Sequence, residues 1–508
     1  MPANDTPTAV ATSASGELDP VQCYRALQAH DPRFDGHFFI AVKSTRIYCR
    51  PVCRVRVPKA VNCSFFRHAA QCEQAGYRPC MRCRPELAPL ADRWSIQDAG
   101  AVLASSAARR LDEIDSWAEA PSVAGLAERI GVSDRHLRRL FEIHFGVSPL
   151  QYLQTRRLHA ARQLLTDTRL PIGEVAAASG FGSLRRFNAA FLAHYRMTPT
   201  RLRHERVDGG EGSIVRLGYR PPYDIEAMLD FLERRCVAGV EAIEGVGASR
   251  RYLRTLRIES GGRHRQGWIE ACFEPDRNRL ALRIDDGLCD VLPAVIRRIR
   301  AAFDLDADPG AIDAVLAADF PGSAGLRVPG AVDGFELAIR AILGQQVTVA
   351  AAHTIAGRLV ARFGKPIATP RPGLERLFPT PASLARAEPD ALGAIGIVRQ
   401  RQAAIIALAR AADAGQLPLS PAEDPAATMA RLRALPGIGD WTAQYIAMRA
   451  LHWPDAFPAG DIALQRALGL PRSRDATAVA ERASRAWQPW RSYAVLRAWR
   501  TPQPVVPQ

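Results

Sequence analysis

The fold of the C-terminal half is decided by LPGIGDWTA, residues 435–443. Gly437 and Gly439 allow a tight turn between two helices, and the amides of such a turn, with the N-terminus of the second helix, can bind a phosphate. Further along comes FPAGDIAL, residues 457–464, in which Asp461 precedes a predicted helix. Taken separately, the first stretch fits an ordinary helix end and Asp461 fits a helix cap. Their combination is what indicates a site.

The hairpin and the aspartate together resemble the HhH-GPD superfamily of DNA glycosylases. The resemblance implies that the hairpin contacts DNA and that Asp461 stabilises an oxocarbenium-like sugar and guides the attacking water. Trp441 stands where bifunctional members carry a Schiff-base lysine, and no lysine follows Lys365, which favours a monofunctional hydrolase. The lack of cysteine after Cys289 excludes the iron–sulfur cluster that some relatives carry.

Further stretches extend the resemblance over residues 213–500, toward 3-methyladenine DNA glycosylase II of the AlkA type. They are YRPPYD at 219–224, RVPG at 327–330, AILGQQVT at 341–348 and WRSYA at 490–494. By position, Trp441, Tyr445 and Trp499 would line the pocket for a flipped base, and their faces suit cationic alkylated purines. Gln346 stands at this substrate site where relatives place an apolar wedge, and departs from that pattern. Without the family, the i,i+4 spacing of Trp441 and Tyr445 would indicate core packing.

The N-terminal part carries two cysteine pairs that have the spacing of a metal site. The pairs are Cys49 with Cys53, and Cys80 with Cys83. A tetrahedral four-thiolate zinc site needs two such pairs folded back over one ion, so these residues are the predicted zinc ligands. The commoner role of such a site is purely architectural. Cys63 and Cys72 are expected to be buried thiols, because four ligands close the site.

The stretches around these cysteines resemble the N-terminal domain of the bacterial adaptive-response regulator Ada. They are DGHFF at 35–39, IYCRPVC at 47–53 and RPCMRC at 78–83. The resemblance implies that Cys49 irreversibly accepts a methyl group from a DNA methylphosphotriester. Four thiolates on zinc leave a net negative charge, which keeps one sulfur nucleophilic, and methylation would lower repulsion with DNA phosphates. Neighbouring arginines are expected to hold the DNA backbone, namely Arg50, Arg54, Arg56, Arg82 and Arg84.

Residues 122–203 are helical in pattern and contain one helix-turn-helix motif twice. Helices are expected at 123–130, 134–145, 149–165, 172–178 and 183–195. The second helix of each unit carries arginines on its polar positions, namely Arg135 and Arg138 in the first and Arg185 and Arg186 in the second. Two such units could enter successive major grooves. The alternative is an amphipathic bundle with arginine on its solvated face.

This helical segment also resembles an AraC-type transcription-regulator domain. The resemblance is carried by GFGS at 180–183, followed by Phe187, Phe191 and Pro199. It implies sequence-specific binding of promoter DNA, with RNA polymerase as a further partner.

Composition agrees with a multidomain chain that binds nucleic acid. A net charge of +15 indicates a polyanionic partner, either nucleic acid or a membrane surface. No apolar run approaches the roughly 20 residues of a membrane helix, so double-stranded DNA is the favoured partner and no membrane is expected. Residues 1–16 lack the order of a signal peptide and are expected to be a disordered leader, which predicts a cytoplasmic location. The chain is expected to be a monomer.

We therefore expect a multidomain fold class with about four folded units. They are a small α+β zinc domain at 17–92, an all-α AraC-type double helix-turn-helix at 121–204, a mixed antiparallel α/β domain at 214–325 and an all-α helix-hairpin-helix glycosylase domain at 326–500. A linker and helix at 93–120 and a hinge at 205–213 are expected between these units, and a tail at 501–508 follows them.

Three functions remain open from the sequence. The favoured one is an alkylation-repair enzyme that is also a methylation-switched transcription activator. The second is a transcription regulator whose C-terminal domain binds damaged bases without turnover, which Asp461 and the aromatic residues disfavour. The third is a constitutive repair enzyme whose basic helices bind DNA without sequence preference. The PCHR tetrapeptide of an alkylguanine methyltransferase is absent, so direct repair of alkylguanine is not expected.

Overall fold

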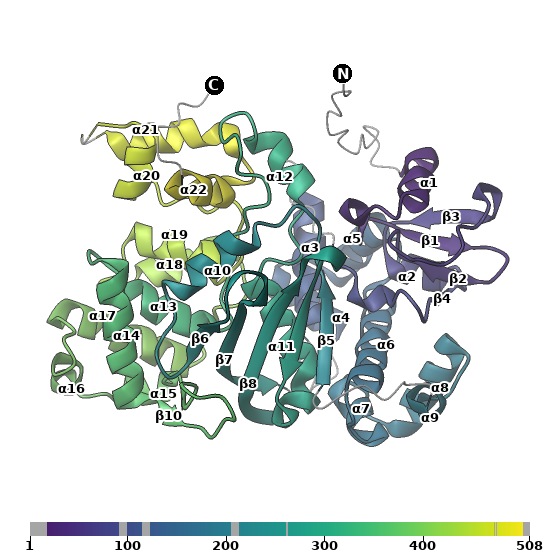
Figure 1. Cartoon of the computed structure of the whole chain (residues 1–508), viewed down its shortest axis with the longest axis horizontal. Coiled ribbons are helices and arrows are strands. Elements are labelled where there is room, and N and C mark those ends of the chain that lie inside the picture. The colour runs from purple at the N-terminus through teal and green to yellow at the C-terminus, as the bar shows by residue number, and fades with distance from the viewer. Residues whose placement is uncertain are drawn as a thin grey trace.

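Folded units lie side by side in the computed structural model, which describes residues 18–90, 99–113, 122–204, 213–260, 263–471, 473 and 475–500. In Figure 1 the purple N-terminal unit occupies one end of the molecule, a teal sheet the middle, and green-to-yellow helices the other end. The predicted leader, the tail and nearly all of the hinge fall outside the described residues. Among the described helices, none combines the length and apolar character needed to cross a membrane.

The N-terminal unit is a small α+β fold on a four-stranded sheet of order β3-β1-β2-β4. Its elements are α1 (Pro20–Gln28), β1 (Phe39–Val42), β2 (Ile47–Cys49), β3 (Cys63–Phe66), α2 (Ala69–Gln74) and β4 (Arg78–Pro79), with 3-10 turns at Pro32–Phe34, Ala60–Asn62 and Pro85–Leu87. All of β1 is buried, because its alternating side chains face two cores. Ile40 shares one core with Leu27 of α1, and Phe39 shares the other with Cys72 of α2.

The next unit is helical, and the long helix α6 (Pro149–Asp167) joins its two halves. The other helices are α3 (Ala99–Asp112), α4 (Val123–Ile130), α5 (Asp134–Phe145), α7 (Ile172–Ala178), α8 (Leu184–Tyr195) and α9 (Pro199–His204). Ser133 and Ser183 cap α5 and α8 by accepting backbone N–H groups. Gly131 ends α4 at a φ of 78°, which glycine adopts without strain. The predicted duplication of the helix-turn-helix is therefore present.

Helix α3 lies in the segment 93–120, which was expected to be a linker with a helix. Its Ala107 and Leu111 lie in one buried cluster with Leu126 of α4 and Phe141 of α5. Helix α3 is therefore part of the first helix-turn-helix core. The apolar stripe of α3 needs a partner, and its neighbours in the chain supply one.

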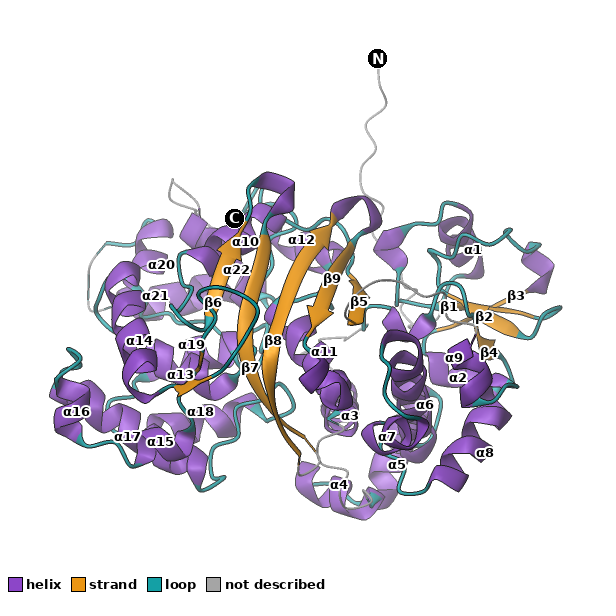
Figure 2. Cartoon of the chain, turned by 60° about the horizontal axis from the view of Figure 1, so that its bottom comes forward, coloured by secondary structure: helices purple, strands orange, loops and turns teal. Residues whose placement is uncertain are grey.

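The middle unit is built on a five-stranded antiparallel sheet of order β5-β9-β8-β7-β6. The elements are β5 (Ser213–Gly218), α10 (Ile225–Glu233), β6 (Glu241–Glu244), β7 (Arg251–Ser260), β8 (Arg263–Glu274), β9 (Arg279–Ile284) and α11 (Leu292–Ala302), with 3-10 turns at Gly247–Ser249, Pro275–Arg277 and Asp286–Val291. Strand β9 alternates, burying Leu280, Leu282 and Ile284 on the core face. Figure 2 shows this orange sheet between the C-terminal helices and helices α3–α8.

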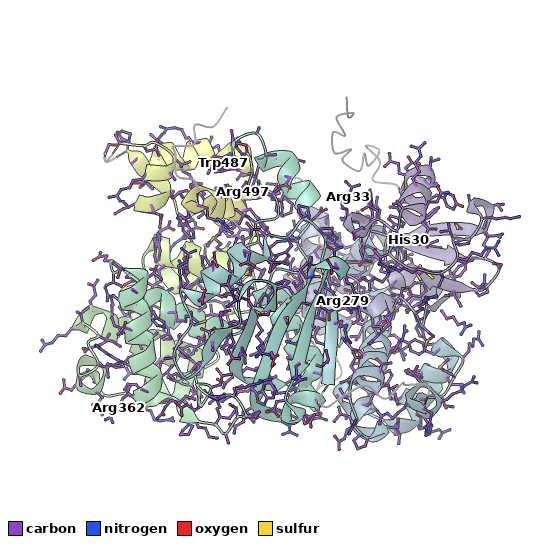
Figure 3. All side chains as sticks on the ribbon, viewed as in Figure 1. His30, Arg33, Arg279, Arg362, Trp487 and Arg497 are labelled. Atoms are coloured by element: carbon purple, nitrogen blue, oxygen red, sulfur yellow. The ribbon has the colours of Figure 1, made fainter. Side chains whose placement is uncertain are left out.

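The C-terminal unit is helical, as expected, but it includes residues 309–316 from the range 214–325 expected for the mixed domain, because Ile312 and Leu316 lie in the C-terminal core. Its elements are α12 (Pro309–Leu316), α13 (Gly334–Leu343), α14 (Val349–Phe363), α15 (Pro381–Ala385), α16 (Pro389–Gly393), α17 (Arg399–Asp413), α18 (Pro425–Arg433), α19 (Asp440–Arg449), α20 (Ile462–Ala467), α21 (Ala476–Ala483), a 3-10 turn at Ser484–Trp487 and α22 (Arg491–Arg500). It departs from an all-α domain in a two-residue ladder of β10 (Lys365–Pro366) with β11 (Arg376–Leu377). Trp487 and Arg497, labelled in Figure 3, hold the last helices to the α12 region by hydrogen bonds to Asp319 at 2.6 Å and Asp313 at 2.5 Å.

The units share buried surface with one another. Leu164 of α6 and Phe191 of α8 lie in the same buried cluster as Val215 of β5 and Ile284 of β9. The second half of the helix-turn-helix unit is therefore packed on the middle sheet. Nearly all of the hinge between these two units lies outside the described residues, and this packing rests on contacts of the flanking helices and strands.

A buried arginine makes a further junction, between the N-terminal and middle units. Arg220 is fully buried. Its guanidinium donates hydrogen bonds to backbone carbonyls of both units, those of Asp35, Pro89, Leu90, Asp306 and Ala307. A buried guanidinium needs partners for its five N–H groups, and this junction supplies them.

Candidate active site and metal centre

The carboxylate of Asp461 accepts three N–H groups at the start of α20. Its Oδ2 accepts the indole N–H of Trp441 at 2.7 Å, and its Oδ1 accepts that of Trp499 at 3.2 Å. Oδ1 also accepts the backbone N–H of Leu464 at 2.7 Å, so Asp461 is the N-cap of α20. An ionised carboxylate is purely an acceptor, and these donors match it. The capping role and the pairing with two tryptophans thus coexist in one side chain.

Three aromatic rings gather around this carboxylate. Trp441 stacks on Tyr445 with ring centroids 5.3 Å apart and planes 12° from parallel, and Tyr445 lies 6.5 Å from Trp499. All three rings are half-buried, so they are not enclosed in the core. Arg449 donates to the Tyr445 hydroxyl at 2.5 Å. Burial alone would raise the pKa of Tyr445, but Arg449 and Arg235 outweigh burial and the pKa is lowered.

The hairpin between α18 and α19 contains two glycines that differ in conformation. Gly437 has a φ of 74°, and a Cβ on it would lie 3.0 Å from the Cβ of Ala404 in α17. Gly439 has a φ of −85°, lies in open space and is the N-cap of α19. Both glycines are exposed, which a phosphate bound at this turn would require.

Two adjacent glutamines follow α13 and differ in their contacts. Gln345 Nε2 donates to the carbonyl of Gly437 at 3.0 Å and to the hydroxyl of Thr442 at 2.9 Å, and so braces the hairpin. Gln346 is exposed and has a φ of 53°, an uncommon conformation for a residue other than glycine. Among the described residues it forms no hydrogen bond with Asp461 or the aromatic rings. The structure therefore places Gln346 at the surface beside the hairpin.

The four predicted zinc ligands, Cys49, Cys53, Cys80 and Cys83, converge. Their sulfur atoms all lie within 4.8 Å of one another, and Cys53 Sγ lies 4.0 Å from Cys80 Sγ. Ligands about 2.3 Å from one tetrahedral zinc stand roughly 3.8 Å apart, so this donor set fits Zn²⁺. Hydrogen bonding with Cys53 raises the pKa of Cys49, whereas hydrogen bonding with Cys49 lowers the pKa of Cys80. The opposite directions mean that one thiol holds its proton while its neighbour is a thiolate. All four sulfurs can be thiolates together only when a cation lies between them.

These cysteines differ in exposure and in bonding. The Cys83 sulfur accepts the backbone N–H of Arg50 at 3.4 Å, whereas Cys49 Sγ accepts no backbone hydrogen bond among the described residues. An accepted N–H bond stabilises a thiolate and reduces its nucleophilicity, which favours Cys49 as the more reactive sulfur. Cys49 is only 6% exposed, however, and Cys83 is the least buried of the four. Outside the set, Cys72 is buried as expected, but Cys63 is half-exposed because it begins the edge strand β3.

Two of the five arginines expected to hold DNA are engaged inside the protein. Arg50 pairs with buried Asp35 and donates to the carbonyl of Cys83 at 3.1 Å. Arg84 pairs with Asp167 of α6 at 2.6 Å. These guanidinium groups position the cysteine loops and do not face outward. The exposed arginines are Arg54, Arg56 and Arg82.

The predicted arginines of the helix-turn-helix units are all exposed. Arg135 and Arg138 lie on α5, and Arg185 and Arg186 lie on α8. Arg138 pairs with Asp134 at 3.1 Å, an exposed contact of little energy that a phosphate could replace. Helix α6 between the units has 19 residues and is about 28 Å long, close to the ~34 Å repeat of DNA.

Sequence spacing missed another convergence of side chains. Glu73 of α2, His159 of α6 and His194 of α8 place ligand atoms within 4.8 Å of one another. These residues come from helices far apart in the chain, so no local motif marks them. Gln345 was also missed, although it lies inside a stretch that carries the family resemblance.

Models of protein families match the chain one after another. They are the metal binding domain of Ada over residues 22–86, a helix-turn-helix domain over 126–205, the AlkA N-terminal domain over 214–333 and the HhH-GPD superfamily base excision DNA repair protein over 339–492. The two halves also match separate relatives in Escherichia coli. DNA-3-methyladenine glycosylase 2 is 37% identical over 56% of this chain and 96% of its own length. The bifunctional transcriptional activator/DNA repair enzyme Ada is 32% identical over 38% of this chain and 51% of its own length.

A relative in Mycobacterium tuberculosis has the same arrangement over nearly its whole length. It is the "Probable bifunctional transcriptional activator/DNA repair enzyme AlkA", 39% identical over 94% of this chain and 96% of that protein. This coverage exceeds what a single shared domain would give. The chain therefore belongs to the family of bifunctional transcriptional activator/DNA repair enzymes that join an Ada-type metal-binding domain and a helix-turn-helix to an AlkA-type HhH-GPD repair domain.

Proposed function

We propose that the C-terminal half is a monofunctional DNA glycosylase that removes alkylated purines such as 3-methyladenine from double-stranded DNA. The observation that carries this proposal is the Asp461 carboxylate, bonded by the indoles of Trp441 and Trp499 in a unit that also exposes a helix-hairpin-helix turn. The Escherichia coli relative named DNA-3-methyladenine glycosylase 2 supports the substrate class.

The proposed chemistry follows from charge. A cationic alkylated purine stacks favourably on electron-rich rings, which Trp441, Tyr445 and Trp499 present. The bond between sugar and base breaks with both electrons going to the base, which leaves uncharged. Positive charge develops on the sugar, where the Asp461 carboxylate stabilises it. A water oxygen then bonds to the same carbon and its proton passes to solvent.

The test is release of free base from methylated duplex DNA by the intact chain, followed by analysis of the DNA strands. We expect free 3-methyladenine and uncut strands, because no lysine follows Lys365 to form a Schiff base. If no base is released, the C-terminal half is a damaged-base binding domain in a regulator. If strands are cut as the base leaves, the monofunctional assignment is wrong.

We further propose that the four-cysteine site binds Zn²⁺ and that Cys49 accepts a methyl group from a DNA methylphosphotriester. Bound zinc holds the sulfurs as thiolates at neutral pH. The Cys49 thiolate attacks the methyl carbon, a carbon–sulfur bond forms, and the carbon–oxygen bond breaks with its electron pair remaining on the phosphate diester. This assignment is supported by the match to the metal binding domain of Ada and by Cys49 Sγ accepting no backbone hydrogen bond in the described part of the chain.

Mass spectrometry of peptides tests which sulfur accepts the methyl group. After incubation with DNA that carries methylphosphotriesters, we expect one methyl group, on Cys49. Cys49→Ser should abolish the transfer, and Cys63→Ser, outside the ligand set, should leave it unchanged. A methyl group on Cys83 would show that the more exposed sulfur is the acceptor. No methylated cysteine would make the site architectural.

The link from this site to the helix-turn-helix units runs through α6. Buried Arg162 of α6 donates to the carbonyl of Cys80 at 3.0 Å and pairs with Glu86 at 3.0 Å. We propose that methylation of Cys49 removes one negative charge from the N-terminal unit and so raises the affinity of the protein for promoter DNA. The methylated protein would then activate transcription as a monomer that contacts RNA polymerase. Anisotropy titrations of promoter and random duplexes before and after methylation test this. If the affinities for the promoter and random duplexes are equal, both before and after methylation, the protein is a constitutive repair enzyme whose basic helices bind DNA without sequence preference.

A further inference from the structure

A second group of metal-ligating side chains lies where the N-terminal unit meets the helix-turn-helix unit. Glu73 Oε1 lies 2.9 Å from His159 Nε2 and 3.3 Å from His194 Nε2. The three side chains are 8%, 6% and 12% exposed in that order. They come from α2, α6 and α8, so the group joins three helices that are distant in sequence.

Neighbouring polar groups orient the carboxylate of Glu73. The Tyr48 hydroxyl donates to Glu73 Oε1 at 2.8 Å and lies 3.0 Å from His159 Nε2. The Thr155 hydroxyl donates to the other oxygen, Glu73 Oε2. The Nε2 atom of His194 is buried and makes no hydrogen bond within the described part of the chain, although it faces Glu73. A buried imidazole nitrogen without a hydrogen bond is uncommon in a folded protein.

The charge balance at Glu73 differs from that of other buried carboxylates in the chain. Glu86, Asp35 and Glu241 each pair with arginine, which is permanently charged. Among the described residues, the ion-pair partners of Glu73 are imidazoles, which carry charge only when protonated. A buried carboxylate without a permanent cation is costly, and a bound metal ion would supply the missing charge.

We propose that Glu73, His159 and His194 form a second metal site, for a divalent transition ion such as Zn²⁺. Ligand atoms about 2.0–2.2 Å from one tetrahedral ion stand roughly 3.3–3.6 Å apart. The 3.3 Å between Glu73 Oε1 and His194 Nε2 fits this spacing, and the 2.9 Å between Glu73 Oε1 and His159 Nε2 would lengthen by about half an ångström when an ion binds. Two imidazoles and one carboxylate suit zinc and related ions, not magnesium or calcium. An ion bound here would fix the C-terminal end of α8 against the N-terminal unit. The opposite end of α8 carries the exposed Arg185 and Arg186.

Metal counting on the full-length, tag-free protein tests the site. Native mass spectrometry with added Zn²⁺ is expected to show two ions per chain. With Co²⁺, one equivalent should produce intense thiolate charge-transfer bands and the second should not, because its ligands are nitrogen and oxygen. His194→Gln should remove the second equivalent and keep the thiolate bands. His136→Gln, at an exposed histidine of α5, is the matched control and should retain two ions.

The thiolate bands also report that the N-terminal unit is folded in each variant. If His194→Gln loses these bands, Glu73→Gln decides in its place, since it keeps the shape and removes the charged ligand. A wild-type chain that binds one ion overturns the proposal and leaves Glu73 in contact with the two histidines alone. Two ions in both Glu73→Gln and His194→Gln would place the second ion elsewhere and also overturn it.

Discussion

The position of the Asp461 carboxylate is set by two indole groups that come from different helices, α19 and α22. Replacing Trp441 by Phe keeps a ring to stack on Tyr445 but removes the 2.7 Å hydrogen bond to Asp461. A hydrogen bond to a charged group is worth about 1.5–3 kcal/mol, so we expect single-turnover base release to slow about 10-fold or more. Trp453→Phe is the control, because the indole of Trp453 forms no hydrogen bond with Asp461 among the described residues. An unchanged rate in Trp441→Phe would show that this bond does not position the carboxylate.

A second residue-scale prediction concerns the dependence of stability on pH. Burial raises the pKa of Asp304 to about 7, although Arg327 and a hydrogen bond from Tyr493 at 2.9 Å oppose the rise. In the unfolded chain an aspartate titrates near pH 3.9, so between about pH 4 and pH 7 the folded state binds more protons. The contribution of Asp304 to the free energy of unfolding therefore falls as pH rises through this window.

Asp304→Asn removes this titration. We subtract the free energy of unfolding of the wild type from that of the variant. We expect this difference to be larger at pH 8 than at pH 5 by on the order of 2–3 kcal/mol. Urea unfolding at both pH values measures the change. A difference between the two proteins that is the same at pH 5 and pH 8 would contradict the account.

Sequence spacing located residues whose partners are close in the chain. The cysteine pairs were found in this way, whereas Trp441 and Tyr445 were assigned from the family resemblance, because their i,i+4 spacing alone indicates core packing. It did not show that Arg50 turns inward, because its partner Asp35 is brought to it by the fold. Glu73 and its histidines were missed for the same reason. Roles that depend on a tertiary contact cannot be deduced from local pattern.

At the scale of elements, helices with strong caps were predicted closely. Helix α5 begins directly after Ser133 and ends directly before Gly146, and both capping residues are signals that the local sequence carries. The ladder of β10 and β11 was missed, because two-residue strands have no periodicity to detect. The sheet was expected only as part of a mixed antiparallel α/β domain, because its strand order depends on pairings that local sequence does not show.

The hairpin gives a paired prediction at this scale. Gly437→Ala forces a Cβ into a left-handed residue near Ala404, so we expect a loss of about 1–3 kcal/mol of stability and weaker DNA binding. Gly439→Ala has open space and a negative φ, so we expect a cost below about 1 kcal/mol. Thermal unfolding and anisotropy with duplex DNA measure both variants. An equal loss of stability in Gly437→Ala and Gly439→Ala would contradict the different conformations of these two glycines in the turn.

At the scale of the whole molecule, buried contacts join the units that lie on either side of the predicted hinge at 205–213. Arg220 bridges the N-terminal and middle units, and the second helix-turn-helix half shares a core with the sheet. Sequence composition can predict a polar linker, but it does not predict which surfaces of the two linked units pack against each other. The N-terminal unit, the helix-turn-helix unit and the C-terminal repair domain therefore lie in one packed assembly.

The junction at Arg220 yields a prediction for unfolding. Arg220→Met leaves the carbonyls of Asp35 and Leu90 without their donor, so we expect a loss of about 3–5 kcal/mol at this interface. Calorimetry should then show the N-terminal unit melting before the rest. Arg216→Met, at a half-exposed arginine on β5, is the control and should unfold like wild type. A single unchanged transition in Arg220→Met would mean that the junction adds nothing to cooperativity.

The measurement that tests the central claim most directly is the single-turnover rate of 3-methyladenine release by Asp461→Asn. Asparagine caps a helix as well as aspartate does, so α20 should persist while the charge is lost. The control is Asp424→Asn, at the N-cap of α18, which has the same capping role outside the site. We predict a loss of at least ~100-fold in Asp461→Asn and none in the control, with DNA affinity retained in both. A rate in Asp461→Asn within a few-fold of wild type would contradict the account and show that this carboxylate does not carry the chemistry.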